Sequence, residues 1–160
     1  MQRLNACDQQ NDRCSYRYKY NRSRRYCIPP HSASKRVIDA LFAGQFLLLL
    51  SRETLLEVQR VLSDPEIMYK HGWADKKLNS FCLALELRAR LIEPRTVVPP
   101  SLTRDFTDTK WVTLALDGQA DFLVTLDRRH LRRLKRIGET RIIGPAEFLR
   151  ELEASQNKRL

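Results

Sequence analysis

The sequence lacks any apolar run long enough to cross a membrane. Its most apolar stretch, FLLLL at Phe46–Leu50, is far shorter than the roughly 20 residues that a membrane-spanning helix needs. The N-terminus also lacks the apolar core of a signal peptide. We therefore expect a cytoplasmic protein without a membrane span. The FLLLL run is instead typical of a strand that is covered on both faces.

Cysteine, glycine and histidine are all scarce. The four cysteines contain no CxxC pair, and no Cys/His set has zinc-finger spacing. The five glycines form no phosphate-binding loop. The three histidines, His31, His71 and His130, give little support to a Ser–His–Asp or Cys–His arrangement, and each is interpreted as a surface residue. Cys82 lies in an apolar helical pattern and is predicted to be a small core residue.

Acidic residues are missing from Ser15–Pro30, where tyrosine alternates with arginine and lysine. Residues 1–30 hold seven Lys or Arg against Asp8 and Asp12, a net charge of +5 out of +10 for the whole chain. Such a basic balance favours a nucleic-acid partner. A solvated face with an unusual tail is the alternative interpretation.

Helical and strand patterns alternate after this segment, which predicts an α/β fold with a central, mainly parallel sheet. We expect residues 1–30 to be atypical, a domain over 31–152 and a C-terminal tail over 153–160. Expected strands cover residues 45–51, 120–127 and 140–144. Expected helices cover residues 35–44 (capped by Ser34), 52–62 (capped by Ser51), 64–70, 74–92, 108–119 and 145–155, with a basic helix or turn over 128–138.

Four acids follow strands or open helices in this pattern, where α/β folds place their ligands. They are Glu57, Asp105, Asp108 and Asp127. Carboxylates are the ligands that Mg²⁺ and Mn²⁺ prefer, and such a site can hydrolyse a phosphodiester. The alternatives are helix capping for Asp105 and Asp108 and a turn role for Asp127. Nearby cations suited to phosphate contacts include Arg104, Lys110, Arg128, Arg129 and Arg132.

Three segments together resemble a known family. RVIDALFAGQFLLLLSRETLLEVQRVL, TRDFTDTKWVTLALDGQADFLVTLDRRHL and TRIIGPAEFL are similar to PIN-domain proteins of the bacterial group of toxin–antitoxin toxins (VapC-like). The resemblance implies a three-layer fold whose central parallel sheet is flanked by helices. It also implies an endoribonuclease that depends on Mg²⁺ or Mn²⁺. The family's acids fall on Glu57, Asp108 and Asp127, with Asp105 as a close neighbour and Thr125 in support. Expected partners are RNA, a cognate antitoxin and a second copy of the chain.

The first strand of that family, which reads like VIDTNVLVSALL and carries a metal-ligating Asp, is missing or replaced here. The codons for Tyr16–Asn21, read one base later, permit IDTNII, so we interpret residues 1–30 as an out-of-frame translation. A sequencing error, a disabling mutation or programmed frameshifting would each produce it. A chain without this strand is expected to be unstable and inactive as a nuclease. A non-catalytic RNA-binding protein and the inert product of a disrupted gene remain alternative interpretations.

Overall fold

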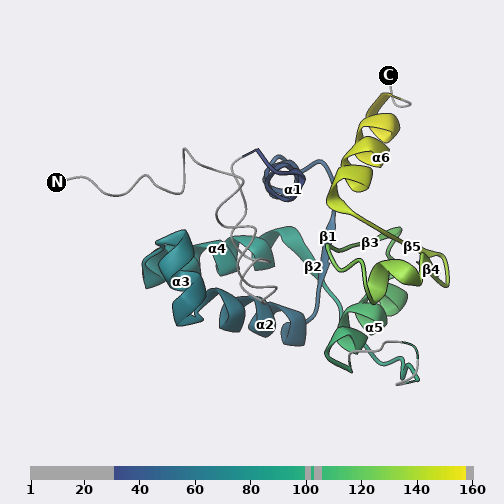
Figure 1. The fold of residues 1–160 in the computed structure, drawn as a ribbon, viewed down its shortest axis with the longest axis horizontal. Helices are drawn as coiled ribbons and strands as arrows, with labels where there is room; N and C mark the ends of the chain where they lie inside the picture. The colour runs from purple at the N-terminus through teal and green to yellow at the C-terminus, as the bar shows by residue number, and fades with distance from the viewer. Residues whose placement is uncertain (1–30, 100–101, 103–105, 158–160) are drawn as a thin grey trace.

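The computed structural model describes residues 31–99, 102 and 106–157, so the N-terminal segment, Arg104 and Asp105 lie outside the described residues. Helices and strands alternate along the described chain (Figure 1). In chain order they are α1 (Ala33–Phe42), β1 (Leu48–Leu50), α2 (Arg52–Leu62), α3 (Pro65–His71), α4 (Asp75–Arg88), β2 (Ala89–Leu91), the 3₁₀ turn η2 (Phe106–Asp108), α5 (Thr109–Asp117), β3 (Phe122–Val124), the 3₁₀ turn η3 (Leu131–Arg133), β4 (Arg136–Ile137), β5 (Thr140–Ile143) and α6 (Pro145–Asn157). None of the described helices is both long and apolar enough to span a membrane.

Serine side chains cap the starts of α1 and α2. The cap of α2 is the predicted residue, whereas that of α1 is not. The Ser51 hydroxyl accepts the Thr54 backbone N–H at 3.1 Å, which confirms the predicted cap of α2. The prediction for α1 was wrong by two residues. Ser32, and not Ser34, caps this helix by accepting the Lys35 backbone N–H at 3.2 Å. Both serines fit the capping pattern, and the one with extended backbone became the cap.

The predicted helix over residues 74–92 was too long. Helix α4 ends at Arg88, and Ala89–Leu91 form β2, which pairs in parallel with β1. The residues of β2 continue the helical spacing of α4 in the sequence. Their backbone N–H and C=O groups nevertheless pair with β1, which is far from them in the sequence. The buried thiol of Cys82 in α4 confirms its predicted place in the core.

The strands form two separate small sheets within the described ranges. One contains β1 and β2 in parallel; the other has the order β3-β5-β4, with β3 and β5 parallel and β4 antiparallel. The α/β class and the mainly parallel pairing are therefore confirmed. The expected single central sheet is divided between β1 and β3.

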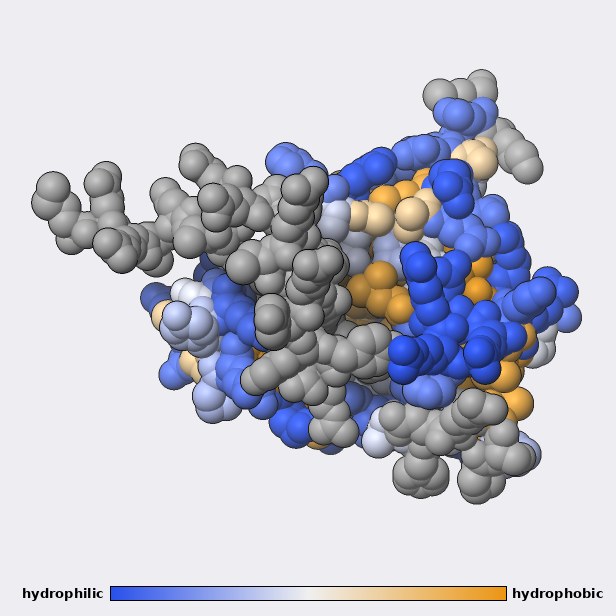
Figure 2. Space-filling view, in the orientation of Figure 1, coloured by the Kyte–Doolittle hydropathy of each residue, from blue (hydrophilic) through white to orange (hydrophobic). Residues whose placement is uncertain are grey.

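The central strands are less buried than their sequences predicted. In β1 only Leu50 is buried, while Leu48 and Leu49 are half-buried, and every residue of β3 is half-buried. Leu47 and Leu91 are exposed beside them. Figure 2 shows apolar surface in a hollow at the centre of the molecule, in the region where Figure 1 places β1 and β2. The prediction that FLLLL is covered on both faces was therefore wrong.

Helices hold the two sheets together. Helix α5 contacts both β1 and β3, and α6 contacts α1 and β3. The Phe148 ring of α6 contacts Phe46, before β1, at 5.0 Å between centroids and Phe122, at the start of β3, at 5.7 Å. At Gly118, after α5, an added Cβ would lie 2.9 Å from the Leu114 carbonyl oxygen and 2.6 Å from Leu49 Cδ1, and the contact with the backbone oxygen requires glycine. The ends of β1 and β3 are thereby fixed relative to the start of α5.

Candidate metal centre

Three potential metal ligands converge at the start of α5 and the turn after β3. Ligand atoms of Asp108, Asp127 and His130 all lie within 4.8 Å of one another. Asp108 precedes α5, is only 8% exposed and makes no side-chain capping hydrogen bond. Asp108 thus occupies the predicted N-cap position of α5, but its side chain does not cap the helix. The predicted pair Asp108 and Asp127 does lie together.

Asp127 is held in place by the turn that it opens. Its backbone N–H donates to the Thr125 hydroxyl at 3.0 Å. Its Oδ1 accepts the backbone N–H groups of Arg129 at 2.9 Å and His130 at 3.1 Å. Burial raises the pKa of Asp127, but these backbone hydrogen bonds and the nearby His130 outweigh it and leave the pKa below its ordinary value. The Asp127 side chain can therefore stabilise the turn through Oδ1 and still bind a metal ion through Oδ2.

His130 was missed by the sequence analysis, which treated it as a surface residue. Its Nδ1 lies 3.1 Å from Asp127 Oδ2, and its side chain is 36% exposed, against 9% for that of Asp127. The spacing of three residues after an Asp that opens a turn was the available signal. It was weak because the surrounding sequence is dominated by arginine.

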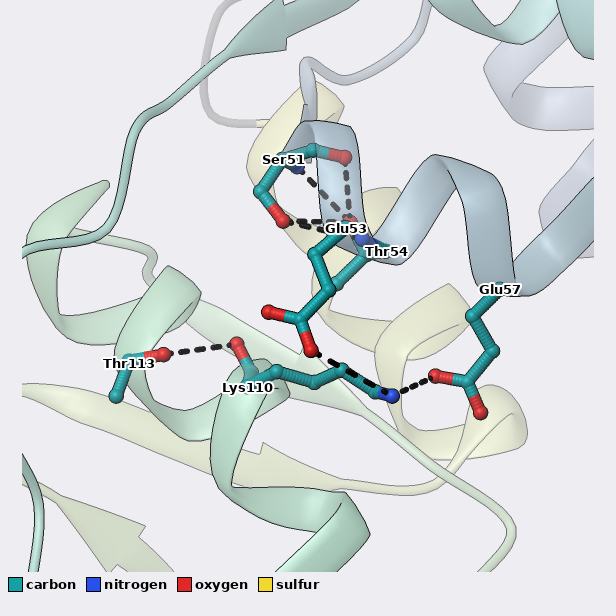
Figure 3. Close-up of polar contacts among 6 residues, drawn as sticks. All are labelled: Ser51, Glu53, Thr54, Glu57, Lys110 and Thr113. Atoms are coloured by element: carbon teal, nitrogen blue, oxygen red, sulfur yellow. Dashed lines mark hydrogen bonds and ion pairs between the residues drawn. The ribbon is translucent and has the colours of Figure 1, made fainter.

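Glu57, a predicted metal ligand, lies outside this cluster. Its Oε2 is 2.5 Å from the Nζ of Lys110, a residue predicted to contact RNA, and the two side chains are 23% and 19% exposed. The Lys110 side chain extends from α5 between Glu57 and Glu53 of α2, with Glu53 at 3.9 Å (Figure 3). The contact with Glu57 is an ion pair without hydrogen-bond geometry, since Glu57 Oε2 is buried without a hydrogen-bond partner.

The predicted RNA-binding arginines have different surroundings. Arg128 and Arg129 are exposed directly after Asp127. Arg132 is half-buried, pairs with Glu147 at 3.5 Å and lies against Gly144, where an added Cβ would be 3.1 Å from its Nη1. Arg128 and Arg129 are therefore accessible to solvent, whereas Arg132 forms an ion pair with Glu147 of α6.

A family model described as PIN domain matches residues 22–129, more than half of the chain. The chain belongs to the PIN-domain family. No curated protein and no solved structure matches it significantly. The PIN-domain match includes Glu57, Asp108 and Asp127, begins directly after Tyr16–Asn21 and ends one residue before His130.

PIN domains are in general nucleases that act on RNA and depend on divalent metal ions. The residues present here fit such an ion. Two carboxylates and an imidazole supply oxygen and nitrogen ligands within 4.8 Å of one another, and both carboxylates are shielded from solvent. Asp108, Asp127 and His130 are thus the candidate metal centre of this PIN domain.

Proposed function

We propose that this PIN domain carries the site of a metal-dependent endoribonuclease. The observation that supports the proposal best is the convergence of Asp108, Asp127 and His130 beside the exposed Arg128 and Arg129. Carboxylates that hold a cation next to exposed arginines suit a phosphodiester, because the substrate is an anion and its transition state carries more charge.

The roles of the side chains follow from their surroundings. A Mg²⁺ or Mn²⁺ ion at this centre would activate water and neutralise charge on the phosphate. Asp108 and Asp127 would hold that ion, and Thr125 keeps Asp127 oriented through its 3.0 Å contact. Arg128 and Arg129 would bind the RNA backbone, which carries no base information, so the sequence preference must come from other contacts.

We further propose that the chain derives from the cytoplasmic toxin of a toxin–antitoxin system, with a small antitoxin protein as its partner and with self-association. The support is the resemblance of the three segments described above. Full activity would need the acid of the missing first strand. The out-of-frame hypothesis is supported by the divided sheet and by the half-buried β1 and β3, which have the character of strands that lack a neighbour.

The test compares RNA cleavage by the present chain and by a restored chain, in which Tyr16–Asn21 are replaced by IDTNII. Labelled single-stranded RNA is incubated with Mg²⁺ or Mn²⁺. We expect the restored chain to cleave it and the present chain to be at least about 100-fold slower, because loss of a metal ligand should cost at least as much as the roughly 10–100-fold typical of a residue that only orients one. In the restored chain, Asp127→Asn should cost about 100-fold or more.

Asp121→Asn is the matched control, because Asp121 is an exposed acid at the other end of β3. Its activity should equal that of the restored parent. Cleavage that survives Asp127→Asn or removal of divalent ions by a chelator would contradict the nuclease proposal. RNA binding without cleavage, unchanged or tighter after Asp127→Asn, would instead favour a non-catalytic RNA-binding protein.

A further inference from the structure

We propose that His130 is itself a metal ligand, and that Asp108, Asp127 and His130 bind a single ion of the Mn²⁺, Co²⁺ or Zn²⁺ class in preference to Mg²⁺. The inference deepens the proposed nuclease function, because it names the class of ion at that site. It concerns residues of the present chain, in which the acid of the missing strand has no counterpart.

The geometry of the pair Asp127 and His130 suits a shared cation. Asp127 Oδ1 is already used by two backbone N–H groups, so Oδ2 is the oxygen that faces the imidazole, with Nδ1 at 3.1 Å. Two ligand atoms at right angles around an ion, each about 2.1 Å from it, lie about 3.0 Å apart. The observed separation therefore matches one edge of a coordination octahedron as well as it matches a hydrogen bond.

The charge near the site fits one divalent ion. Asp108 and Asp127 together supply two negative charges, and a neutral imidazole adds none. The charge of Glu57 is balanced by Lys110, whose Nζ lies 2.5 Å away. A second divalent ion would lack a compensating carboxylate among the described residues of this cluster. We therefore expect a stoichiometry of one ion per chain.

The nitrogen ligand decides the preference among ions. Mg²⁺ favours oxygen ligands and retains several waters, whereas imidazole suits transition-metal ions such as Zn²⁺ and raises their affinity relative to Mg²⁺. The His130 side chain is 36% exposed, against 9% for that of Asp127, and Asp108 is buried, so His130 forms the outer wall of the site. A substitution there is consequently tolerated by the fold more readily than one at either Asp.

The alternative is a purely positioning role, in which Nδ1–H donates to Asp127 Oδ2 and never meets the ion. The two roles differ in selectivity. A positioning residue supports every ion that Asp127 binds, so its loss should weaken Mn²⁺ and Mg²⁺ alike. A nitrogen ligand supports mainly the transition-metal ion.

The test is titration of the purified full chain with Mn²⁺, followed by electron paramagnetic resonance, and with Mg²⁺, followed by calorimetry. We expect one Mn²⁺ site. His130→Gln should weaken Mn²⁺ binding about 10–100-fold while changing Mg²⁺ binding less than about threefold. His130→Asp should shift the preference towards Mg²⁺, because it replaces nitrogen by oxygen. Asp127→Asn should abolish binding of both ions.

His31→Gln is the matched control, since His31 is exposed and belongs to no described metal cluster, and it should bind like the parent. Circular dichroism without metal checks that each variant folds. Equal loss of both ions in His130→Gln, or no Mn²⁺ site in the parent, would overturn the inference. The nuclease proposal is judged separately by RNA cleavage in the restored chain. Cleavage there without ion selectivity removes only the role of His130, and selective binding without cleavage by the restored chain removes only the nuclease.

Discussion

Lys110 and Glu57 form the least exposed ion pair between a lysine or arginine and a carboxylate among the described residues. It joins α5 to α2, and the two side chains are only 19% and 23% exposed. Removing one charge of a partly buried ion pair leaves the other charge unpaired and poorly solvated. The free-energy cost of that unpaired charge exceeds what the intact pair contributes to stability. The pair therefore fixes the position of α2 relative to the start of α5, where the candidate metal centre lies.

Lys110→Met should lower the free energy of unfolding by about 1–3 kcal/mol, because it leaves Glu57 shielded and unpaired. Adding Glu57→Gln to Lys110→Met should recover most of that loss, since neither charge then remains. Urea unfolding of the parent, both single variants and the double variant measures the coupling.

The exposed pair between Arg36 of α1 and Glu153 of α6 is the matched control, at 3.1 Å with side chains 59% and 62% exposed. The same cycle there should give a coupling below about 1 kcal/mol, as for other surface pairs. If Lys110 and Glu57 show strictly additive effects, their contact does not bind α2 to α5.

At the residue scale the sequence predicted part of the site. Asp108 and Asp127 were found because acids at strand ends and helix starts converge in parallel α/β folds. The pairing of Glu57 with Lys110 was not predictable, since it depends on how two helices lie across β1. His130 was missed because a histidine among arginines has no periodic signature, and only the turn at Asp127 brings it inward.

At the element scale, the start of α2 determines where Glu57 lies. Ser51 and Thr54 form a reciprocal capping box, and both residues are buried. The Ser51 backbone N–H donates to the Thr54 hydroxyl at 2.9 Å, and this hydroxyl donates to the Ser51 carbonyl oxygen at 3.0 Å. The turn is thus closed without solvent, directly after β1.

Thr54→Val keeps the shape of the side chain but removes its hydroxyl, and so leaves the buried Ser51 N–H without an acceptor. The expected loss is about 1–3 kcal/mol of unfolding free energy. Thr113→Val on α5 is the matched control, because the Thr113 hydroxyl only donates to the Lys110 carbonyl oxygen at 3.0 Å. It should cost less than about 1 kcal/mol. Thermal and urea unfolding compare the two variants, and equal losses would refute the role of the capping box.

The elements differ in how far the sequence determined them. Helix α2 was predicted with its correct cap, because Ser51 follows an apolar run and precedes a periodic one. Strand β2 was missed because Ala89–Leu91 continue the apolar spacing of α4. Its pairing with β1 is a contact between segments far apart in the sequence, and local patterns carry no information about such contacts.

At the scale of the whole molecule, the divided sheet is the main departure from expectation. Two sets of contacts join the two sheets into one body. Helix α5 packs on both β1 and β3, and the Phe148 ring contacts Phe46 and Phe122. Their strands are nevertheless only half-buried. The alternation of helices and strands predicted the class, but it could not reveal that the described strands pair into two sheets. Under the out-of-frame hypothesis, this division reflects a strand that only the shifted frame would supply.

The restored chain tests this interpretation of the divided sheet. Replacing Tyr16–Asn21 by IDTNII supplies an apolar, β-branched strand that can pair with exposed edges and cover half-buried leucines. Each such side chain contributes about 1.5–3 kcal/mol when fully buried. We therefore expect the melting temperature to rise by about 10 °C or more when several such side chains are buried, at roughly 2–4 °C per kcal/mol for a chain of this size. Circular dichroism and calorimetry measure the change.

A second replacement, INTNII, separates the strand from its acid. It should stabilise the chain as much as IDTNII does, because the apolar residues are the same, yet it should not restore RNA cleavage. Genomic DNA across the codons for Asn11 to Ser34 gives an independent check, since codons that forbid IDTN would exclude the shifted frame. If neither replacement raises the melting temperature, β1 and β3 do not accept a strand, and the N-terminal segment then belongs to the protein in its present reading.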